Sequence, residues 1–473
     1  MKPPPSRPGA RAAVALLAAA LLAGCATVDP DAGLAPVAET VRERLGAELR
    51  ADRSEADRSA IDARVAELLG QPLTADAAVQ VALLAHRGLQ ARLADLGITA
   101  AEVVQAGRLP NPGFAFGRMR AGDEREIERG LHLNLARLLA LPMVRDLEQR
   151  RFEQLQRELT MDLLAAAADV RRAWVEAVAA EQMLRYRRQV RDAAEAGAEL
   201  ARRMEQVGNF NRLMRAREQG FHAEAALGLA QAEQAARASR ERLVRKLGLW
   251  GAQTAFTLPE RLPDLPAEPL DAPDIERQGM AQRLDVQAAR LAAEQAARNL
   301  GLTRTTRFVD VLELGLARNS SSDGPTERGW ELEFELPLFD WGDAKVARAE
   351  SVHLRTLHRA AQTAIDARSE LREAYGAYRT AWDLARHQRD EILPLAQRIS
   401  EEQLLRYNGM FIGVFDLLAD ARAQIAAVVA TIDALRSFWL AQADLDMALV
   451  GKPALIPVAG PAGPAAAAAP DPH

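Results

Sequence analysis

The segment Trp330-Glu-Leu-Glu-Phe-Glu-Leu336 alternates apolar and acidic residues at every step. Successive side chains of a β-strand point to opposite faces, so one face of this strand would be apolar and the other ionised. The acidic face would carry Glu331, Glu333 and Glu335. Such a strand separates water from an apolar environment, which is either a lipid bilayer or the side of a helix.

Three further segments show weaker alternation. Residues 308–317 place Leu312, Leu314 and Leu316 opposite Glu313, although Asp310 departs from the pattern. In the first half of the chain, strand-like alternation runs over 113–141 and includes phenylalanines 114 and 116 and leucines 131, 133 and 135. Polar loops at 120–128 and 319–328 would join each pair. Four strands are too few for a closed membrane barrel, since known barrels begin at about eight. The sequence thus leaves two alternatives: a barrel shared between subunits, or a soluble sheet packed on a helix.

Long helices flank these strands. A first helix is expected from Leu73 to Gly107 with Thr74 as its N-cap. The 54 residues Met143–Ala196 contain neither Gly nor Pro. Large apolar residues at 152, 163 and 174 are 11 apart, a period that keeps an apolar stripe nearly straight or slightly right-handed. This spacing suits the wall of a wide tube, but a plain amphipathic helix would show it too.

The chain then repeats itself. A turn at 207–209, a helix over 211–248 and a Pro-rich linker at 252–275 are followed by helix 275–302, strands 307–338, helix 343–407, a turn at 408–413 and helix 414–450. Residues 208–219 match residues 413–424 at six of twelve positions, with a constant offset of 205. Leu89-Gln-Ala91 likewise matches Val286-Gln-Ala288 at two of three positions. The fold predicted is a duplicated helix–two strands–helix–turn–helix unit.

The N-terminus has the features of a lipoprotein signal. Arg7 and Arg11 precede the apolar run 12–23, which ends in Leu22-Ala-Gly-Cys25, similar to a bacterial lipobox. We expect cleavage before Cys25 and lipidation of this single cysteine, and Ala26 favours delivery to the outer membrane; an incidental cysteine is the alternative. No later apolar run is expected to reach the ~20 residues of a transmembrane helix.

Composition and motifs exclude other classes. Lys+Arg 60 against Asp+Glu 65 gives a net charge of -5, unlike a nucleic-acid binder. The seven histidines are scattered, and no His-Glu-x-x-His, Gly-x-Ser-x-Gly or P-loop pattern occurs. We expect no enzymatic activity, no metal site and no cofactor.

Four stretches in order resemble the TolC-like outer-membrane efflux family over about residues 72–451. They are the opening helix at 73–91, the entry to the first strand at Val104-Gln-Ala-Gly-Arg-Leu-Pro-Asn-Pro112, the exit at Leu336-Pro-Leu-Phe-Asp-Trp-Gly342, and the two helical turns, the second followed by Asp416-Leu-Leu418. The resemblance implies a mostly α-helical homotrimer, whose twelve strands form one β-barrel in the outer membrane and whose helical hairpins form an α-barrel in the periplasm. It also implies a periplasmic adaptor and an inner-membrane pump as partners.

The resemblance assigns roles to several residues. The tip turns that would meet the adaptor contain Gly208, Asn209, Gly409 and Gly413. Asp416 fits the first of two aspartates that narrow the closed tip in this family. Two features depart from the family's pattern: Ala419 stands at the second place with Asp420 beside it, and the second turn is longer than usual. The alternation places Glu313, Glu331, Glu333 and Glu335 on the water-facing side of the strands. In the barrel that the resemblance implies this side is the lumen, where they would favour cations or merely be solvated.

The expected organisation is a signal peptide (1–24), a lipid-anchored lead-in (25–71), a first repeat (72–251), the linker (252–275), a second repeat (276–451) and an Ala/Pro tail (452–473). The function expected is a passive exit duct of a tripartite efflux system for small molecules or ions. A duct of a type I protein secretion system and a non-channel periplasmic scaffold lipoprotein are the alternatives.

Overall fold

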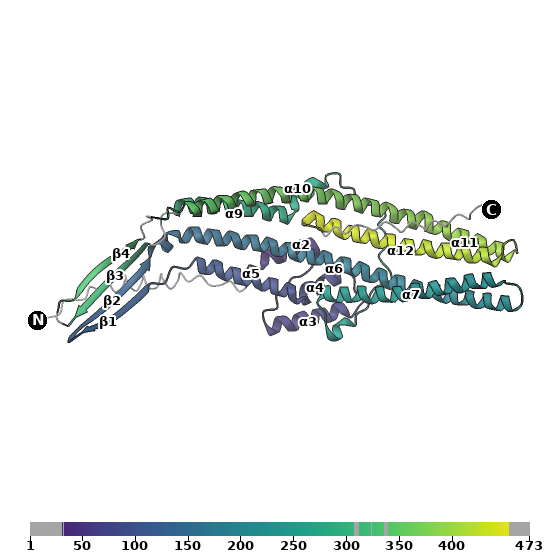
Figure 1. The fold of residues 1–473 in the computed structure, drawn as a ribbon, viewed down its shortest axis with the longest axis horizontal. Coiled ribbons are helices and arrows are strands. Elements are labelled where there is room, and N and C mark those ends of the chain that lie inside the picture. Colours follow the sequence, from purple (N-terminus) through teal and green to yellow (C-terminus); the bar gives the residue numbers. More distant parts are fainter. Residues whose placement is uncertain (1–30, 32, 307–311, 323, 335–338, 454–473) are drawn as a thin grey trace. The chain divides into compact units, whose positions relative to one another are not determined.

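The computed structural model describes residues 31, 33–306, 312–322, 324–334 and 339–453. Cys25, Glu335, the signal peptide and all but the first two residues of the tail lie outside this part. The described chain is mainly helical with one four-stranded antiparallel sheet (Figure 1). It divides into two units: residues 1–37, 93–158 and 287–362 form the first, and 38–92, 159–286 and 363–473 the second.

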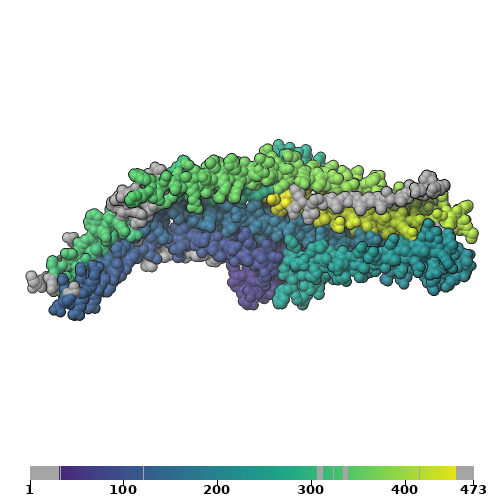
Figure 2. Space-filling model, viewed as in Figure 1, coloured from purple at the N-terminus to yellow at the C-terminus, as the bar shows by residue number. Residues whose placement is uncertain are grey.

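The first unit contains the sheet. Its strands are β1 (Gly113–Ala121), β2 (Glu124–Asn134), β3 (Leu312–Ser321) and β4 (Glu327–Phe334), in the order β1-β2-β3-β4. Every neighbouring pair is antiparallel, and β2 and β3, which lie in different repeats, join the two hairpins. In Figure 2 the green atoms of β3 and β4 lie directly against the blue atoms of β1 and β2. The four predicted strands are confirmed as one sheet.

The long helix of the first repeat begins earlier than predicted. α6 spans Leu135–Gln206, 72 residues, and includes Pro142. The prediction of strand up to residue 141 is wrong, because Asn134 Oδ1 accepts a hydrogen bond from the Arg137 N–H (2.7 Å) and so caps the helix directly after β2. The first hairpin loop is also much tighter than predicted, since only Gly122 and Asp123 separate β1 from β2, and Gly122 has φ 62°.

The two predicted lead helices are each broken once, at equivalent positions. α4 (Ala75–Ala85) and α5 (Arg87–Ala106) are separated by His86, and α8 (Ile275–Gln282) and α9 (Leu284–Thr306) by Arg283. His86 and Arg283 both have extended backbone and lie 197 residues apart, the offset between Gln90 and Gln287. The duplication therefore includes these breaks. Thr74 caps α4, as predicted, by accepting from the Ala77 N–H.

The remaining helices agree with the sequence closely. α7 (Arg212–Leu247) lies between the cap Asn211 and the left-handed Gly248, and α12 spans Val414–Val450. The predicted helix 343–407 consists of α10 (Asp343–His387), a π-helical turn (Gln388–Ile392) and α11 (Leu393–Asn408), with Pro394 just after the turn. The lead-in contains two short helices, α2 (Ala35–Leu45) and α3 (Glu55–Leu69).

The second unit has its core between α10 and α12. Tyr378, Trp382, Phe438 and Leu445 are buried there, together with Leu265 from the Pro-rich linker. The linker is held by the protein: Trp382 Nε1 donates to the Pro266 carbonyl (3.1 Å), Trp439 Nε1 donates to the Pro263 carbonyl (3.0 Å), and the Leu270 N–H donates to Tyr378 Oη (2.9 Å). After its short 3-10 turn (Gly251–Thr254), the linker thus forms part of the packed structure.

α12 corrects one expectation. Residues Asp416–Val450 are long and apolar enough to cross a membrane by length and composition. Core helices of soluble proteins pass the same test, and Phe438, Ala441, Leu445 and Ala448 of this helix lie in the core of the second unit. Packing accounts for only part of the apolar character of α12, because 22% of its most apolar stretch is buried.

Candidate functional site: the two-faced sheet and the helical tips

The sheet has one acidic face. Residues paired across antiparallel strands share a face, so the register aligns Glu333 with Glu313 and Asn134, and Glu331 with Gly315 and His132. Asn134 Nδ2 donates to Glu313 Oε1 (3.3 Å). The predicted set Glu313, Glu331 and Glu333 is brought together, while Glu335 lies outside the described residues. The register adds four glutamates that sequence alternation missed, and these are Glu124, Glu126, Glu128 and Glu327.

The opposite face of the sheet is apolar near the helices, and it is uncovered. One row across all four strands consists of Phe114, Leu131, Leu316 and Trp330, and these side chains are 69%, 45%, 56% and 72% exposed. Leu332 in the next row is also exposed. A soluble sheet would bury such a face against a helix. The alternative of a sheet packed on a helix is therefore not what the described part of the chain shows.

The outer edges of the sheet are the second unusual feature. β1 and β4 each pair with one neighbour only among the described strands. Because β1 and β4 run in opposite directions, β4 of one copy can pair antiparallel with β1 of another. An open edge cannot lie in lipid, since its backbone groups would lack hydrogen bonds. An apolar face with two free edges is thus incomplete in a single copy.

The second unit ends in two helical hairpins, which lie side by side at the right of Figure 1. At the first turn, Gly208 has φ 80°, and the N–H groups of Asn209 and Phe210 donate to the Met204 carbonyl. Phe210 is buried, and Arg215 pairs with Glu205 (2.6 Å) across the turn. The turn predicted at Gly208 and Asn209 is therefore compact and closed by its own bonds.

The second turn exposes apolar side chains. Phe411 donates its N–H to the Arg406 carbonyl, and Met410 has φ 61°, a strained value for a residue with a side chain. Gly409 and Gly413 flank this loop as predicted. Met410 and Phe411 are 93% and 83% exposed. Sequence reasoning did not single them out, although two large apolar residues between glycines in a turn were a signal.

The two aspartates predicted at the tip differ in role. Asp416 Oδ2 accepts a hydrogen bond from the Gly413 N–H (3.3 Å), so Asp416 caps α12. Asp420 is half-buried, and its Oδ2 has no hydrogen-bond partner among the described residues. Of these two aspartates, Asp420 is the one with a buried carboxylate oxygen that accepts no hydrogen bond from the described residues.

An ion pair joins the hairpins just behind the turns. Arg422 of α12 donates to Glu218 of α7 (2.8 Å), and the Glu218 side chain is 3% exposed. The Arg422 guanidinium also lies over the Phe221 ring, 4.4 Å from its centroid. Val190, Ala194 and Ala225 form the small apolar cluster next to this pair. Glu218 and Arg422 thus tie the first hairpin to the second.

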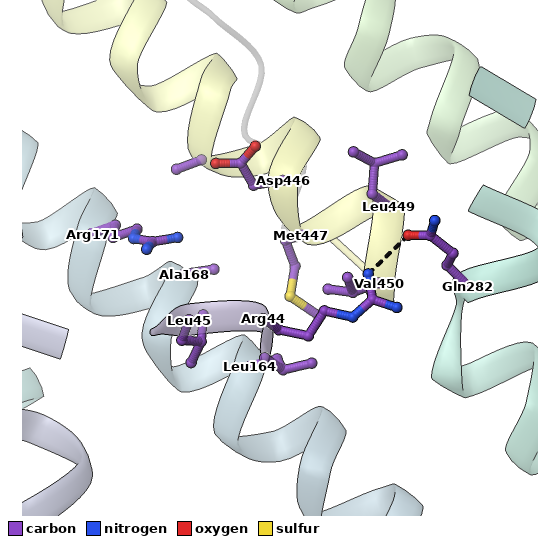
Figure 3. Close-up of a pocket in the computed structure, with 11 residues that line it drawn as sticks. Arg44, Leu45, Leu164, Ala168, Arg171, Gln282, Asp446, Met447, Leu449 and Val450 are labelled. Atoms are coloured by element: carbon purple, nitrogen blue, oxygen red, sulfur yellow. Dashed lines mark hydrogen bonds between the residues drawn. The ribbon is translucent and has the colours of Figure 1, made fainter. Parts of the chain in front are cut away.

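The pockets of the described chain offer no catalytic constellation. The pocket in Figure 3, of about 300 Å³, is lined by Leu45, Leu164, Ala168 and Met447 with Arg44, Arg171 and Asp446 at its margin. Arg44 donates to Gln282 Oε1 (2.9 Å) there, which fixes the lead-in helix α2 to α8. Burial raises the pKa of Asp446. Among the described residues, no group of three or more His, Cys, Asp or Glu is arranged to hold a metal ion.

These features define a class of structure: a duplicated pair of helical hairpins that carries a two-faced, open four-stranded sheet. Several solved outer-membrane channels have this fold. The match with the channel CmeC of Campylobacter jejuni covers 85% of this chain and 89% of the CmeC chain, with a TM-score of 0.68 and 16% sequence identity. The match with the open state of the channel MtrE of Neisseria gonorrhoeae covers 79% of this chain and 88% of the MtrE chain, with a TM-score of 0.66 and 19% sequence identity. The match with VceC, an outer-membrane protein of Vibrio cholerae, covers 83% of this chain and 97% of the VceC chain, with a TM-score of 0.64 and 14% sequence identity.

No family model and no curated protein matches the sequence. At these identities the likeness concerns the fold, and the chain has the fold of these outer-membrane channels, as its resemblance to the TolC-like family led us to expect. The resemblance inferred from four short stretches of sequence is confirmed at that level.

Proposed function

We propose that this chain is the outer-membrane exit duct of a tripartite efflux system. Three copies would place their twelve strands in one outer-membrane barrel and their hairpins in one periplasmic tube. The duct would conduct small molecules or ions passively. The observation that carries the proposal is the exposed apolar face of a sheet with two free edges. Closure into one barrel would pair the backbone groups of both edges and place the apolar face against lipid.

The acidic face supports the same assignment. In a closed barrel the apolar face meets lipid, so the glutamates line the lumen and favour cations. The lipid anchor at Cys25 would add a second attachment to the same membrane. Solved structures of like fold include outer-membrane channels, which favours a duct over an enzyme.

The partners would meet the tips. A periplasmic adaptor, coupled to an inner-membrane pump, would engage the turns at Gly208–Asn209 and Gly409–Gly413. Met410 and Phe411 offer apolar anchors of the kind that dominate protein interfaces. Asp420, together with Asp416, would narrow the closed tip where three copies converge.

Two neighbouring positions on opposite faces of β3 test the placement of the sheet. We expect Leu316→Cys to be protected from a membrane-impermeant maleimide in outer-membrane vesicles, and Ala317→Cys to react, because residue 316 would face lipid and residue 317 the lumen. The wild-type chain serves as the blank, since a lipidated Cys25 has no free thiol and would not react with the maleimide. A periplasmic scaffold without membrane strands would label at both positions, and that result would reject the proposal.

A further inference from the structure

Arginines occupy the part of the apolar face nearest the hairpin loops. The row next to Phe114, Leu131, Leu316 and Trp330 consists of Phe116, Arg129, Arg318 and Arg328. We call Arg129, Arg318 and Arg328 the arginine row. All three side chains are exposed, and the row lies roughly 7 Å beyond the apolar one, which is two residues along each strand. Arg118, Arg120 and Arg125 continue the same face toward the loop of the first hairpin.

The arginine row has no internal counter-charge. Arg318 is paired directly with Arg129 on one side and with Arg328 on the other. Like charges directly opposite each other across strands repel. By register, all seven described glutamates of the strands lie on the other face. None of the three arginines is in an ion pair with a carboxylate within the part of the chain that the structure describes. Within the described residues these guanidinium groups therefore have no carboxylate partner, and they are exposed to anions in their surroundings.

The position of the row indicates which anions. Exposed leucine, phenylalanine and tryptophan side chains precede it on the side toward the helices. Arginine is costly inside hydrocarbon and much less so at the interface. The row would therefore lie where the apolar band ends and the headgroups begin. A partner with acyl chains and a phosphate matches both surfaces together, because guanidinium binds phosphate through two parallel hydrogen bonds.

We propose that the arginine row binds the phosphate groups of lipids in the leaflet next to the hairpin loops, and that it sets the depth of the barrel in that leaflet. This inference rests on the proposed function, since it requires the apolar face to meet lipid. The row belongs to the lipid side, so its lipids would stay bound to the outside of the barrel and take no part in transport. The acidic face would not bind them.

Spin-labelled lipids measure such binding directly. The full-length protein, purified as its assembly, would be reconstituted in phosphatidylcholine vesicles with spin-labelled phosphatidic acid or spin-labelled phosphatidylcholine. We expect phosphatidic acid to associate with the protein about fivefold more strongly, the ratio for one arginine near an anionic headgroup. The variant R129Q/R318Q/R328Q should lower this ratio to near one. The matched control E126Q/E128Q/E327Q removes three charges from the opposite face and should retain it.

The outcomes distinguish failure of the proposed function from failure of the lipid-binding inference. If no motionally restricted lipid is seen with either label, the sheet does not enter the bilayer, and the proposed function fails together with this inference. If restricted phosphatidylcholine is seen without preference for phosphatidic acid, or if R129Q/R318Q/R328Q keeps the preference, only this inference is overturned. Should the glutamine variant not fold, R129K/R318K/R328K must keep a preference, and the wild-type preference must fall in 1 M salt. Failure of either expectation also overturns the inference.

Discussion

The ion pair between Glu218 and Arg422 is expected to hold the two hairpins of each copy together near the tip. Glu218 is almost fully buried, and Arg422 is 37% exposed. Replacing Arg422 with alanine leaves the Glu218 carboxylate shielded and unpaired. Breaking a fully buried pair costs about 3–5 kcal/mol, and an exposed pair is worth at most about 1 kcal/mol. Because one partner is partly in water, we expect R422A to loosen the junction by about 2 kcal/mol.

That magnitude predicts a large change in the closed tip. About 2 kcal/mol corresponds to a change of roughly thirtyfold in an equilibrium constant. If the pair keeps the tip closed, R422A should raise the open fraction of single channels in a planar bilayer by one to two orders of magnitude. Amide exchange of residues 212–222 and 416–426 should become faster by a similar factor.

A double-mutant cycle isolates the pair from other effects. E218Q/R422A should be closer to wild type than R422A alone, because glutamine can be buried without a counter-ion. R215A breaks the more accessible pair with Glu205 inside the first hairpin and serves as a control. Unchanged gating in R422A, with normal expression and assembly, would refute the role given to this pair. Equal effects in R215A and R422A would do so as well.

Three further predictions follow from other parts of the chain. Arg283 is 1% exposed and donates to Asp285 and Glu370, both at 2.6 Å; burial opposes its charge, but these carboxylates raise its pKa. R283M should therefore lower the free energy of unfolding by about 3–5 kcal/mol in denaturant titrations, and a loss below 1 kcal/mol would contradict this. Burial, helped by Lys246, lowers the pKa of His86. The unfolded chain then binds the proton more tightly, so stability should fall as the pH drops below about 6.5, and H86Q should lack this part of the pH dependence; identical pH profiles would show that His86 contributes none of it. Reversing Glu313, Glu331 and Glu333 to lysine should strongly reduce the cation preference in reversal-potential measurements, because four glutamates remain on the same face; unchanged selectivity would remove these residues from the lumen.

Sequence periodicity predicted the elements of this fold well because its signals are local. The alternation at 330–336 and the turns at Gly208 and Gly413 each depend on residues close in the chain. The start of α6 was missed although Asn134 is a recognisable cap, because the alternation of Leu131, Leu133 and Leu135 continued past it. The break at Arg283 has no glycine or proline within three residues, whereas Gly88 lies two residues after the break at His86. The burial of Arg283 depends on its hydrogen bonds to Glu370 and the Ala448 carbonyl, 87 and 165 residues away, which sequence spacing does not reveal.

The candidate site was only partly predictable for the same reason. Alternation within a strand separates two faces, but which residues share a face with another strand depends on register. The register added Glu124, Glu126, Glu128 and Glu327 to the acidic face and placed the arginine row on the apolar one. The role of Asp416 as a helix cap likewise depends on the geometry of the turn. The lipidation of Cys25 and the position of Glu335 on the acidic face remain predictions, because both residues lie outside the described part of the chain.

The central claim is that a single copy is incomplete and that three copies close one membrane barrel. Native mass spectrometry of the detergent-solubilised protein, followed by insertion of the same preparation in a planar bilayer, tests it most directly. We expect a mass of three chains that dissociates only on heating, and discrete channel conductance. A single-chain mass with no conductance, from protein whose helical content is intact, would contradict the claim.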